Sequence, residues 1–332
     1  MGFGGFTALS LAAAVPRRRS VDAVMAMSPP LTLGAAGRLI AWRRRAPFVF
    51  NVQDVFPDVA VELGVINGAR TIAALERLER HTYQMADAVT VLSDDLRDNV
   101  TAKLAAGRGK DADVSKVEVI PNFVDVERID AGGDGNKYRA EFGLGDRLVV
   151  MYAGNVGHSQ SLDMVIAAAR RFNGRDDVVF VINGNGVARA GLERAASGLD
   201  NMVFVDFLPP ERLGDVLSAG DVHLVPLKAG LSRSSVPSKF YSILGAGRPV
   251  VAAVDAGSEL ERVIHANQVG ISVDADQTES FIAAIATLVD AHTTRERFGV
   301  NGRKFVESWL SPAGVAERYI DLFNRLNSAS TT

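Results

Sequence analysis

The residues best suited to binding a ligand lie in a serine-rich run near residue 238. The run S-S-V-P-S-K places Ser235, Ser238 and Lys239 around Pro237. Proline is favoured at the start of a helix, because its missing N–H would have no partner there. A lysine in the first turn of a helix opposes the helix dipole, unless a bound anion offsets both positive charges. We therefore expect Lys239 to bind an anion; the alternative is a solvated surface lysine.

Two glycine-rich loops are further candidates for ligand binding. Gly154, Asn155 and Gly157 follow one apolar run, and Gly184 follows the next. Backbone amides at the start of the helix expected near Ser161 could hold a phosphate oxygen. The alternative for the first loop is a tight turn with a purely structural role.

The second glycine-rich loop partly matches a dinucleotide fingerprint. It reads G-x-G-x-x-R, because Arg189 stands where the third glycine would be, and Asp206 follows about twenty residues later, where the fingerprint needs an acid. A nicotinamide-dependent enzyme is therefore an alternative, against which Arg189 argues.

The elements that must position these residues form an alternating series. Apolar runs alternate with amphipathic stretches along nearly the whole chain, which predicts βαβ units and parallel sheets in an α/β protein. The expected strands are 21–27, 48–52, 88–92, 116–120, 148–153, 178–183, 202–206, 222–226, 250–254 and 270–273. The expected helices include 72–86, 162–172, 236–246, 279–290 and 313–326.

The chain divides into two domains on this pattern. A Gly- and Asp-rich stretch at 130–146 predicts the boundary, with a first domain over 1–135 and a second over 136–310. The second has enough strands for a complete doubly wound domain, whereas the first has only four expected strands and looks incomplete. We expect a final helix, 311–328, to cross back to the first domain.

Composition excludes several classes of protein. The chain has 332 residues, of which 47% are hydrophobic and 23% charged, so it can bury a core and is not intrinsically disordered. It has no cysteine, which excludes disulfides, Cys-ligated metals and thiol catalysis. Its net charge of −3 argues against a general nucleic-acid binder.

The first fifty residues are basic, with seven arginines against one acid, Asp22. Arg17–Arg19 and Arg43–Arg45 could contact an anionic membrane surface, at about 1 kcal/mol per basic residue. The alternative is an ordinary solvated helix face. The sequence has no apolar run of the length needed to span a bilayer.

Several motifs together resemble a known enzyme family. The strand followed by G-N-x-G, and then V-P-S-K-x-Y-x-x-L-x-A-G-R-P-V, resemble the nucleotide-sugar half of retaining glycosyltransferases with two facing Rossmann-like domains, the GT-B fold. More narrowly, the chain resembles family 4 enzymes that build bacterial exopolysaccharide and O-antigen. The segments 27–34, 48–64, 75–93, 119–129 and 207–232 agree in order. The resemblance covers nearly the whole chain and is specific as a set.

This resemblance implies a reaction. A sugar would move from a nucleotide diphospho-sugar, expected to be UDP-linked, to a lipid-linked saccharide acceptor with retention of configuration, in cell-surface polysaccharide biosynthesis. The leaving phosphate would take the acceptor proton, so the protein would supply positioning and positive charge. We expect no cofactor and no metal, and a cytoplasmic protein held at the inner face of the membrane.

The resemblance also implies roles for individual residues. Asp54 and Lys239 would be catalytic, with Asp54 facing the acceptor or the transferred sugar; the alternative for Asp54 is a helix cap before Pro57. The implied donor-binding residues are Gly154, Asn155, Gly157, Gly184, Leu208, Ser235, Ser238, Lys239, Ser242 and Asn122.

The chain also departs from the family pattern. Ser242 stands where a glutamate usually binds the donor ribose, Ser161 replaces a common glycine, and about the first eighty residues of the pattern are missing. Two alternatives therefore stay open, a nucleotide-sugar epimerase of the same fold and an inactive nucleotide-sugar-binding remnant. The D-x-D runs Asp111/Asp113 and Asp274/Asp276 could suggest a metal, but we interpret them as a polar loop and a capping segment.

Overall fold

The computed structural model describes residues 2–14, 20–106, 113–129 and 135–329. The chain forms two compact units, each described below by itself. The first unit comprises Met1–Asn122, Ser232–Val236 and Ala313–Thr332, and the second comprises Phe123–Leu231 and Pro237–Pro312.

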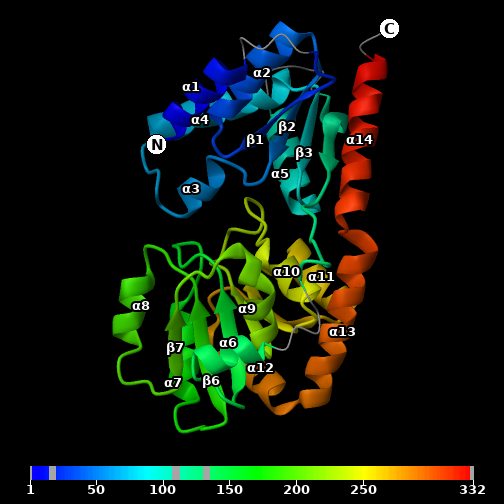
Figure 1. The fold of residues 1–332 in the computed structure, drawn as a ribbon. Coiled ribbons are helices and arrows are strands. Elements are labelled where there is room, and N and C mark those ends of the chain that lie inside the picture. Colours follow the sequence, from blue (N-terminus) through cyan, green and yellow to red (C-terminus); the bar gives the residue numbers. More distant parts are fainter. Residues whose placement is uncertain (1, 15–19, 107–112, 130–134, 330–332) are drawn as a thin grey trace. The chain divides into compact units, whose positions relative to one another are not determined.

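The first unit is built on a parallel sheet of four described strands in the order β1-β2-β3-β4 (Figure 1). The strands are β1 (Val24–Ser28), β2 (Phe48–Val52), β3 (Ala88–Val91) and β4 (Val117–Val119). Its helices are α1 (Phe3–Ala14), α2 (Thr32–Arg44), α3 (Asp58–Glu62), α4 (Ala69–Met85), α5 (Asp94–Ala105) and most of α14 (Pro312–Ala329), with a short 3-10 turn η1 (Val114–Lys116).

Helices cover both faces of the central strands of this sheet. Every residue of β2 is buried, as expected for a parallel strand between two helical layers. Phe48 and Phe50 face the core formed with α2, α4 and α5, whereas Val49 faces α14 through Val315 and Leu322. The C-terminal helix therefore belongs to the first unit, and it closes the second face of the first sheet.

The second unit is a doubly wound parallel sheet of six strands in the order β10-β9-β8-β5-β6-β7. The strands are β5 (Leu148–Ala153), β6 (Val178–Asn183), β7 (Met202–Val205), β8 (Val222–Pro226), β9 (Val250–Val254) and β10 (Gly270–Asp274). The helices are α6 (Asn136–Glu141), α7 (Asp163–Arg171), α8 (Arg189–Ala195), α9 (Leu213–Ala219), α10 (Lys239–Gly245), α11 (Glu259–Asn267), α12 (Thr278–Asp290) and α13 (His292–Trp309), with η2 (Pro210–Arg212).

Alternation along β5 shows how the second sheet is covered. Val150 and Tyr152 pack into the core that contains α7 and α12, whereas Val149 and Met151 pack on the opposite face with α6 and α9. All four side chains are fully buried. The interior strand is thus apolar on both faces, with a single polar tip, the Tyr152 hydroxyl.

The predicted fold class of two parallel α/β domains is confirmed, and each of the ten described strands overlaps an expected one. The units divide at Asn122, however, and not at residue 135. The segment after Asn122 packs on the second unit: Val124 N donates to Leu310 O at 2.9 Å, and Arg303 Nη1 donates to Ile129 O at 3.0 Å. The contacts therefore change before the Gly- and Asp-rich stretch.

Candidate functional site

The candidate site lies at the carboxyl ends of β5, β6 and β8, in the second unit. The chain runs outward from β5 through β6 to β7, then returns to β8 on the other side of β5 and runs outward again. The pair β5 and β8 is therefore the point at which the winding direction reverses. Doubly wound sheets bind ligands in the crevice outside the strand ends at this point.

The two glycine-rich loops pack backbone to backbone at this edge. Gly154 N donates to Asn183 O at 2.9 Å, and Val156 N donates to Asn185 O at 2.9 Å. A Cβ on Gly184 would lie 1.9 Å from Gly154 O, and a Cβ on Gly186 2.3 Å from Val156 O. Neither position has room for a side chain, so both glycines are required by close approach.

The side chain of Asn155 lies between the two loops. A Cβ on Gly186 would lie 2.9 Å from Asn155 Oδ1, and a Cβ on Gly157 would lie 2.7 Å from Asn155 Nδ2. The predicted residues Gly154, Asn155, Gly157 and Gly184 are thus brought together at one edge of the sheet.

Lys239 joins the same group, as the first residue of α10. Its Nζ donates to the Tyr152 hydroxyl at 2.7 Å and to Gln160 Oε1 at 3.1 Å, and lies 4.1 Å from the centre of the Tyr152 ring. A Cβ on Gly154 would lie 3.2 Å from Nζ, so this glycine leaves the space that the lysine head occupies. Burial lowers the pKa of Lys239 to about 7.

The other predicted donor residues of the second unit have simpler surroundings. Ser238 is exposed directly before α10, and Ser242 is half-buried within that helix. Leu208 is half-buried and packs on the core beneath β7. Their contacts with a donor stay predictions.

Asp54 and Ser235 lie together in the first unit. They form an isolated antiparallel bridge, and Val55 N donates to Ser234 O at 2.7 Å. Burial raises the pKa of Asp54, and a hydrogen bond from Ser235 partly offsets this rise. The resemblance implies that Ser235 lies near the donor diphosphate, with Ser238 and Lys239. The chain enters the first unit at Ser232 and leaves it after Val236, so Ser235 belongs to the other unit.

Asn122 also belongs to the first unit, in a row of amide side chains. Its Nδ2 donates to Gln53 Oε1 at 2.8 Å, and Gln53 Nε2 donates in turn to Asn51 Oδ1 at 2.5 Å. Asn51 is fully buried and donates to Thr90 Oγ1 at 2.9 Å and to the Tyr319 hydroxyl at 2.8 Å. This row ties β2, β3 and the end of β4 to α14. The donor contact predicted for Asn122 is not tested by these bonds.

Sequence reasoning missed the two side chains that hold Lys239. Tyr152 counts as an apolar strand residue in the prediction. Its hydroxyl, at the end of the strand that precedes G-N-x-G, is a signal that could have marked it as a site residue. Its hydroxyl donates to Asn155 O at 2.6 Å, which ties the lysine to the glycine-rich loop. Gln160 follows that loop with no distinguishing pattern around it, so nothing in the sequence marked it.

The structure explains why the dinucleotide fingerprint is incomplete. Arg189 Nη1 donates to Gly184 O at 2.6 Å and to Asp206 Oδ1 at 2.6 Å. The acid that a dinucleotide site would use for a ribose is therefore paired with the arginine that replaces the third glycine. This arrangement disfavours the nicotinamide alternative.

The D-x-D runs have other partners in the described residues. Asp113 caps η1 by accepting from Ser115 N at 3.0 Å, whereas Asp111 lies outside the described residues. Asp276 accepts from Ser161 Oγ at 2.5 Å, and the residue that caps α12 is Gln277, so the interpretation of this run as a capping segment was wrong. Within the part of the chain that the structure describes, His, Asp and Glu side chains form no cluster suited to a metal ion.

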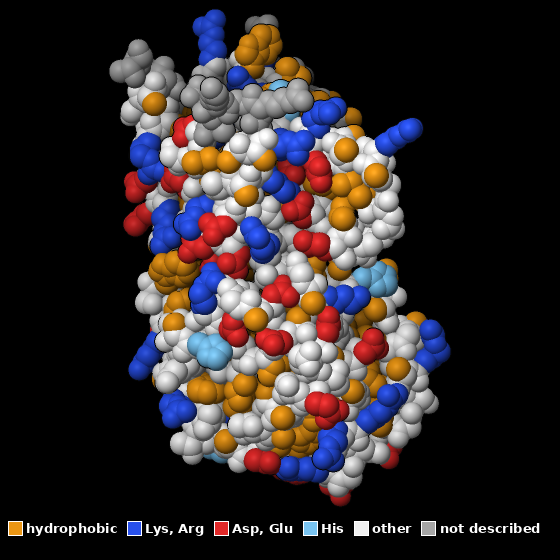
Figure 2. Space-filling model, turned by 180° about the vertical axis from the view of Figure 1, so that it is seen from behind, with side chains coloured by type: hydrophobic (Ala, Val, Ile, Leu, Met, Phe, Trp, Pro, Cys, Tyr) orange, Lys and Arg blue, Asp and Glu red, His pale blue; other side chains and the backbone are white. Residues whose placement is uncertain are grey.

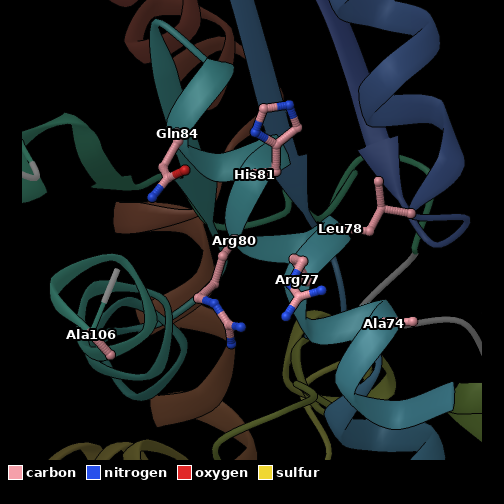
Figure 3. A pocket seen from close by; sticks show the side chains of 7 residues that line it. All are labelled: Ala74, Arg77, Leu78, Arg80, His81, Gln84 and Ala106. Atoms are coloured by element: carbon pink, nitrogen blue, oxygen red, sulfur yellow. The ribbon is translucent and has the colours of Figure 1, made fainter. Parts of the chain in front are cut away.

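A separate hollow of about 820 Å³ lies along α4 in the first unit. Figure 3 shows Arg77, Arg80 and His81 along α4, with Ala106, directly after α5, also lining the hollow. Arg80 lies 3.9 Å from Glu76 in an exposed pair. The hollow is a basic surface feature, distinct from the glycine-rich loops.

Comparisons with known proteins agree with this geometry. Residues 2–122 match the glycosyl transferase 4-like domain, and residues 147–291 match the glycosyl transferases group 1. The chain is a GT-B glycosyltransferase. The two matches fall one in each unit of this glycosyltransferase.

Individual relatives support the same family. The chain is 28% identical to a putative colanic acid biosynthesis glycosyl transferase, WcaI, of Escherichia coli, over 92% of this chain and 74% of that protein. It is 26% identical to the probable glycosyltransferase WbjE of Pseudomonas aeruginosa, over 82% of this chain and 66% of that protein. The chain thus spans about two thirds to three quarters of the length of these relatives.

Solved structures share the fold. Anabaena HepE in complex with UDP-glucose superposes with a TM-score of 0.75 at 14% identity, covering 98% of this chain and 84% of that one. Sucrose-phosphate synthase of Thermosynechococcus elongatus has a TM-score of 0.77 at 17% identity, covering 98% of this chain and 78% of that one. At these identities, the likeness establishes the GT-B fold alone.

Proposed function

We propose that this GT-B glycosyltransferase transfers a sugar from a nucleotide diphospho-sugar to a lipid-linked saccharide, in the biosynthesis of a cell-surface polysaccharide. The observation that carries the proposal is Lys239, an ammonium at the switch point of a doubly wound sheet with neutral groups as its described partners. A UDP-linked donor is favoured because solved neighbours of the same fold hold UDP or UDP-glucose. The relative named for colanic acid biosynthesis supports a polysaccharide product.

The transfer reaction requires positive charge at the place where the nucleoside diphosphate leaves. Lys239 would stabilise the developing charge through charge-assisted hydrogen bonds, each contributing about 1.5–3 kcal/mol. The leaving phosphate would take the proton of the acceptor hydroxyl as that hydroxyl attacks from the same face, which gives retention. No side chain need act as a nucleophile, and the scheme uses no metal.

Asp54 is the acceptor-side residue in this proposal. Its raised pKa, in the half-buried bridge with Ser235, suits a carboxyl that orients a sugar hydroxyl. In this role Asp54 affects turnover and not donor affinity. The helix-cap alternative lacks support, because the cap residue of α3 is Pro57.

We further infer that the first unit contacts the inner face of a membrane. At the end of α2, Trp42 is 67% exposed beside Arg38, Arg43 and Arg45, a combination typical of an interfacial surface. Arg44 instead donates to Ala14 O at 2.7 Å, and Arg17–Arg19 lie outside the described residues. Within the described residues, no helix combines the length and hydropathy that a bilayer span requires.

Vesicle binding tests the membrane contact. In a Trp309→Phe chain, whose fluorescence reports Trp42 alone, the emission should shift to the blue with phosphatidylglycerol vesicles at low salt. This shift should fade as salt screens the arginines. The double variant Arg43→Ser/Arg45→Ser should weaken vesicle binding. The control Arg77→Ser/Arg80→Ser removes the same charge elsewhere on the first unit and should leave the binding unchanged. Loss of binding in the second variant alone would move the contact to α4, and no binding by the wild-type chain would refute it.

A transfer assay distinguishes the enzyme alternatives. The chain is incubated with UDP-glucose, UDP-galactose or the N-acetylated UDP-sugars, labelled in the sugar, with and without lipid-linked saccharides extracted from bacterial membranes. We expect label in the lipid fraction only when both are present, and none with Lys239→Ala. Conversion of the UDP-sugar without acceptor would indicate the epimerase, and nucleotide binding without turnover the inactive remnant.

A further inference from the structure

We propose that Tyr152 and Gln160 are positioning residues that form a neutral cradle for Lys239, directing its ammonium at a phosphate group of the donor without neutralising it. This proposal rests on the function proposed above and concerns how that site keeps its charge available.

The geometry of the cradle fixes the ammonium from three sides. The Tyr152 hydroxyl accepts one N–H at 2.7 Å, Gln160 Oε1 accepts another at 3.1 Å, and the ring face of Tyr152 lies 4.1 Å from Nζ. Gly154 leaves the space for Nζ and Cε. An ammonium has three donors, so these contacts use two and leave the third for a ligand.

The chemical type of the acceptors is the decisive feature. A hydroxyl, an amide oxygen and a ring face each attract a cation, yet none carries a negative charge. The partners of another largely buried lysine are charged: Lys103 contacts the carboxylates of Asp58 and Glu79 at 2.6 and 2.7 Å. A carboxylate on Lys239 would satisfy it in the same way and would repel an incoming phosphate.

The cradle is itself held rigidly. Tyr152 is fully buried in β5, and its hydroxyl donates to Asn155 O at 2.6 Å, so its acceptor lone pair stays turned toward the lysine. Gln160 is tied to the end of β8 by an isolated bridge with Leu227. Both positioning residues therefore rest on the two strands that flank the switch point.

The lowered pKa of Lys239 is consistent with this arrangement. Its cause is burial, and among the described residues Tyr152 is the one titratable group in contact with the ammonium. Because only the protonated lysine attracts a phosphate, affinity for a diphosphate should fall as pH rises above about 7.

The decisive variant is Gln160→Glu, which keeps the shape of the side chain and adds one negative charge. We expect the Kd for UDP at pH 6.5 to rise at least about tenfold, because the new carboxylate forms an ion pair with the lysine and offsets its positive charge. The Kd of the wild-type chain should rise between pH 6.5 and 8.5. The Kd of Gln160→Glu should stay nearly constant over this range, because its lysine remains protonated. Gln277→Glu adds the same charge at an exposed position of the second unit and should keep wild-type affinity and pH dependence.

Tyr152→Phe is a second, independent variant. It removes the hydroxyl but keeps the ring face, so we expect UDP to bind about threefold more weakly, in line with the net contribution of one neutral hydrogen bond. Titration calorimetry measures both variants, and thermal melts without ligand show whether each chain folds.

Equal Kd values and equal pH dependence in the wild-type chain and in Gln160→Glu would overturn the proposed cradle but not the proposed function. A lower melting temperature of Gln160→Glu with an unchanged pH dependence would likewise assign Gln160 a merely structural role. If the wild-type chain bound none of UDP, GDP, dTDP and inorganic pyrophosphate, the proposed function would fail, and the cradle with it.

Discussion

At the scale of single residues, the candidate site depends on positions that cannot carry a side chain. Gly184 and Gly186 let two loops approach within hydrogen-bonding distance at the end of the sheet, and Gly154 makes room for a lysine head. The sequence marked these glycines because they follow apolar strands. It could not show what fills the space beside them, since that is Lys239, from far along the chain.

Gly184→Ala tests this close packing. The new Cβ would meet Gly154 O at 1.9 Å, so one loop must move, and we expect a loss of about 1–3 kcal/mol in the free energy of unfolding together with weaker UDP binding. Denaturant unfolding and calorimetry measure the two effects. Gly191→Ala is the matched control, because nothing lies within 4 Å of its Cβ and alanine favours the helix. A Gly184→Ala chain as stable as the control would contradict the packing.

Asp54 and Ser235 form the second residue-scale test. Asp54→Asn should lower kcat by at least about a hundredfold, in the range of an acid–base or orienting group, and leave the Kd for UDP unchanged. Ser235→Ala removes the hydrogen bond that lowers the pKa of Asp54, so that pKa should rise further. The acidic limb of the pH–rate profile should then move to higher pH. Unchanged kcat in Asp54→Asn would remove Asp54 from the mechanism.

At the scale of elements, the sequence predicted the strands well, but it did not show which unit each segment joins. Strands such as Phe48–Val52 and Val178–Asn183 are buried on both faces and stand out as continuous apolar runs. The segment Ser232–Val236 lies within the predicted second domain, 136–310, but belongs to the first unit. Its place in the first unit depends on long-range bonds such as Asn99 Nδ2 to Arg233 O, at 2.8 Å, which local pattern cannot reveal.

A buried ionic cluster joins α3, α4 and α5 in the first unit. Lys103 contacts Asp58 and Glu79, and the Tyr83 hydroxyl donates to Glu79 at 2.8 Å. Glu79 is fully buried. Removing one partner of such a cluster leaves an uncompensated charge, whereas the intact cluster adds little net stability.

Lys103→Met should therefore cost about 3–5 kcal/mol of the free energy of unfolding. Lys137→Met, at an exposed position of α6, is the control and should change it by less than about 0.5 kcal/mol. Urea unfolding at neutral pH compares them. Equal stabilities would show that the cluster is not desolvated.

The same cluster should make stability depend on pH. Burial raises the pKa of Glu79 to about 7 from 4.5, so its carboxyl binds a proton more tightly in the folded chain. Its stabilising contribution is complete below about pH 4.5 and is lost as pH rises through about 7. The wild-type free energy of unfolding should fall relative to that of Glu79→Gln across this window. A difference that does not change with pH would contradict the shifted pKa.

At the scale of the whole molecule, the charge distribution and the fold are consistent with an enzyme that binds small ligands and not nucleic acid. On the face seen in Figure 2, acidic and basic side chains are interspersed, unlike the continuous basic footprint of a nucleic-acid binder. The GT-B fold was predictable because motifs along nearly the whole chain agree in order. The division at Asn122 was not predictable, because a domain boundary depends on which core the flanking residues join, and composition does not show this.

The most direct test of the central claim is a thermal melt of the chain with and without UDP, GDP, dTDP and NADH. A nucleotide that binds only the folded state stabilises it by about 2.7 kcal/mol at one hundred times its dissociation constant. We predict that UDP raises the melting temperature, that NADH does not, and that the UDP shift is lost in Lys239→Ala. A cooperative melt that no nucleoside diphosphate shifts would contradict the assignment of this site.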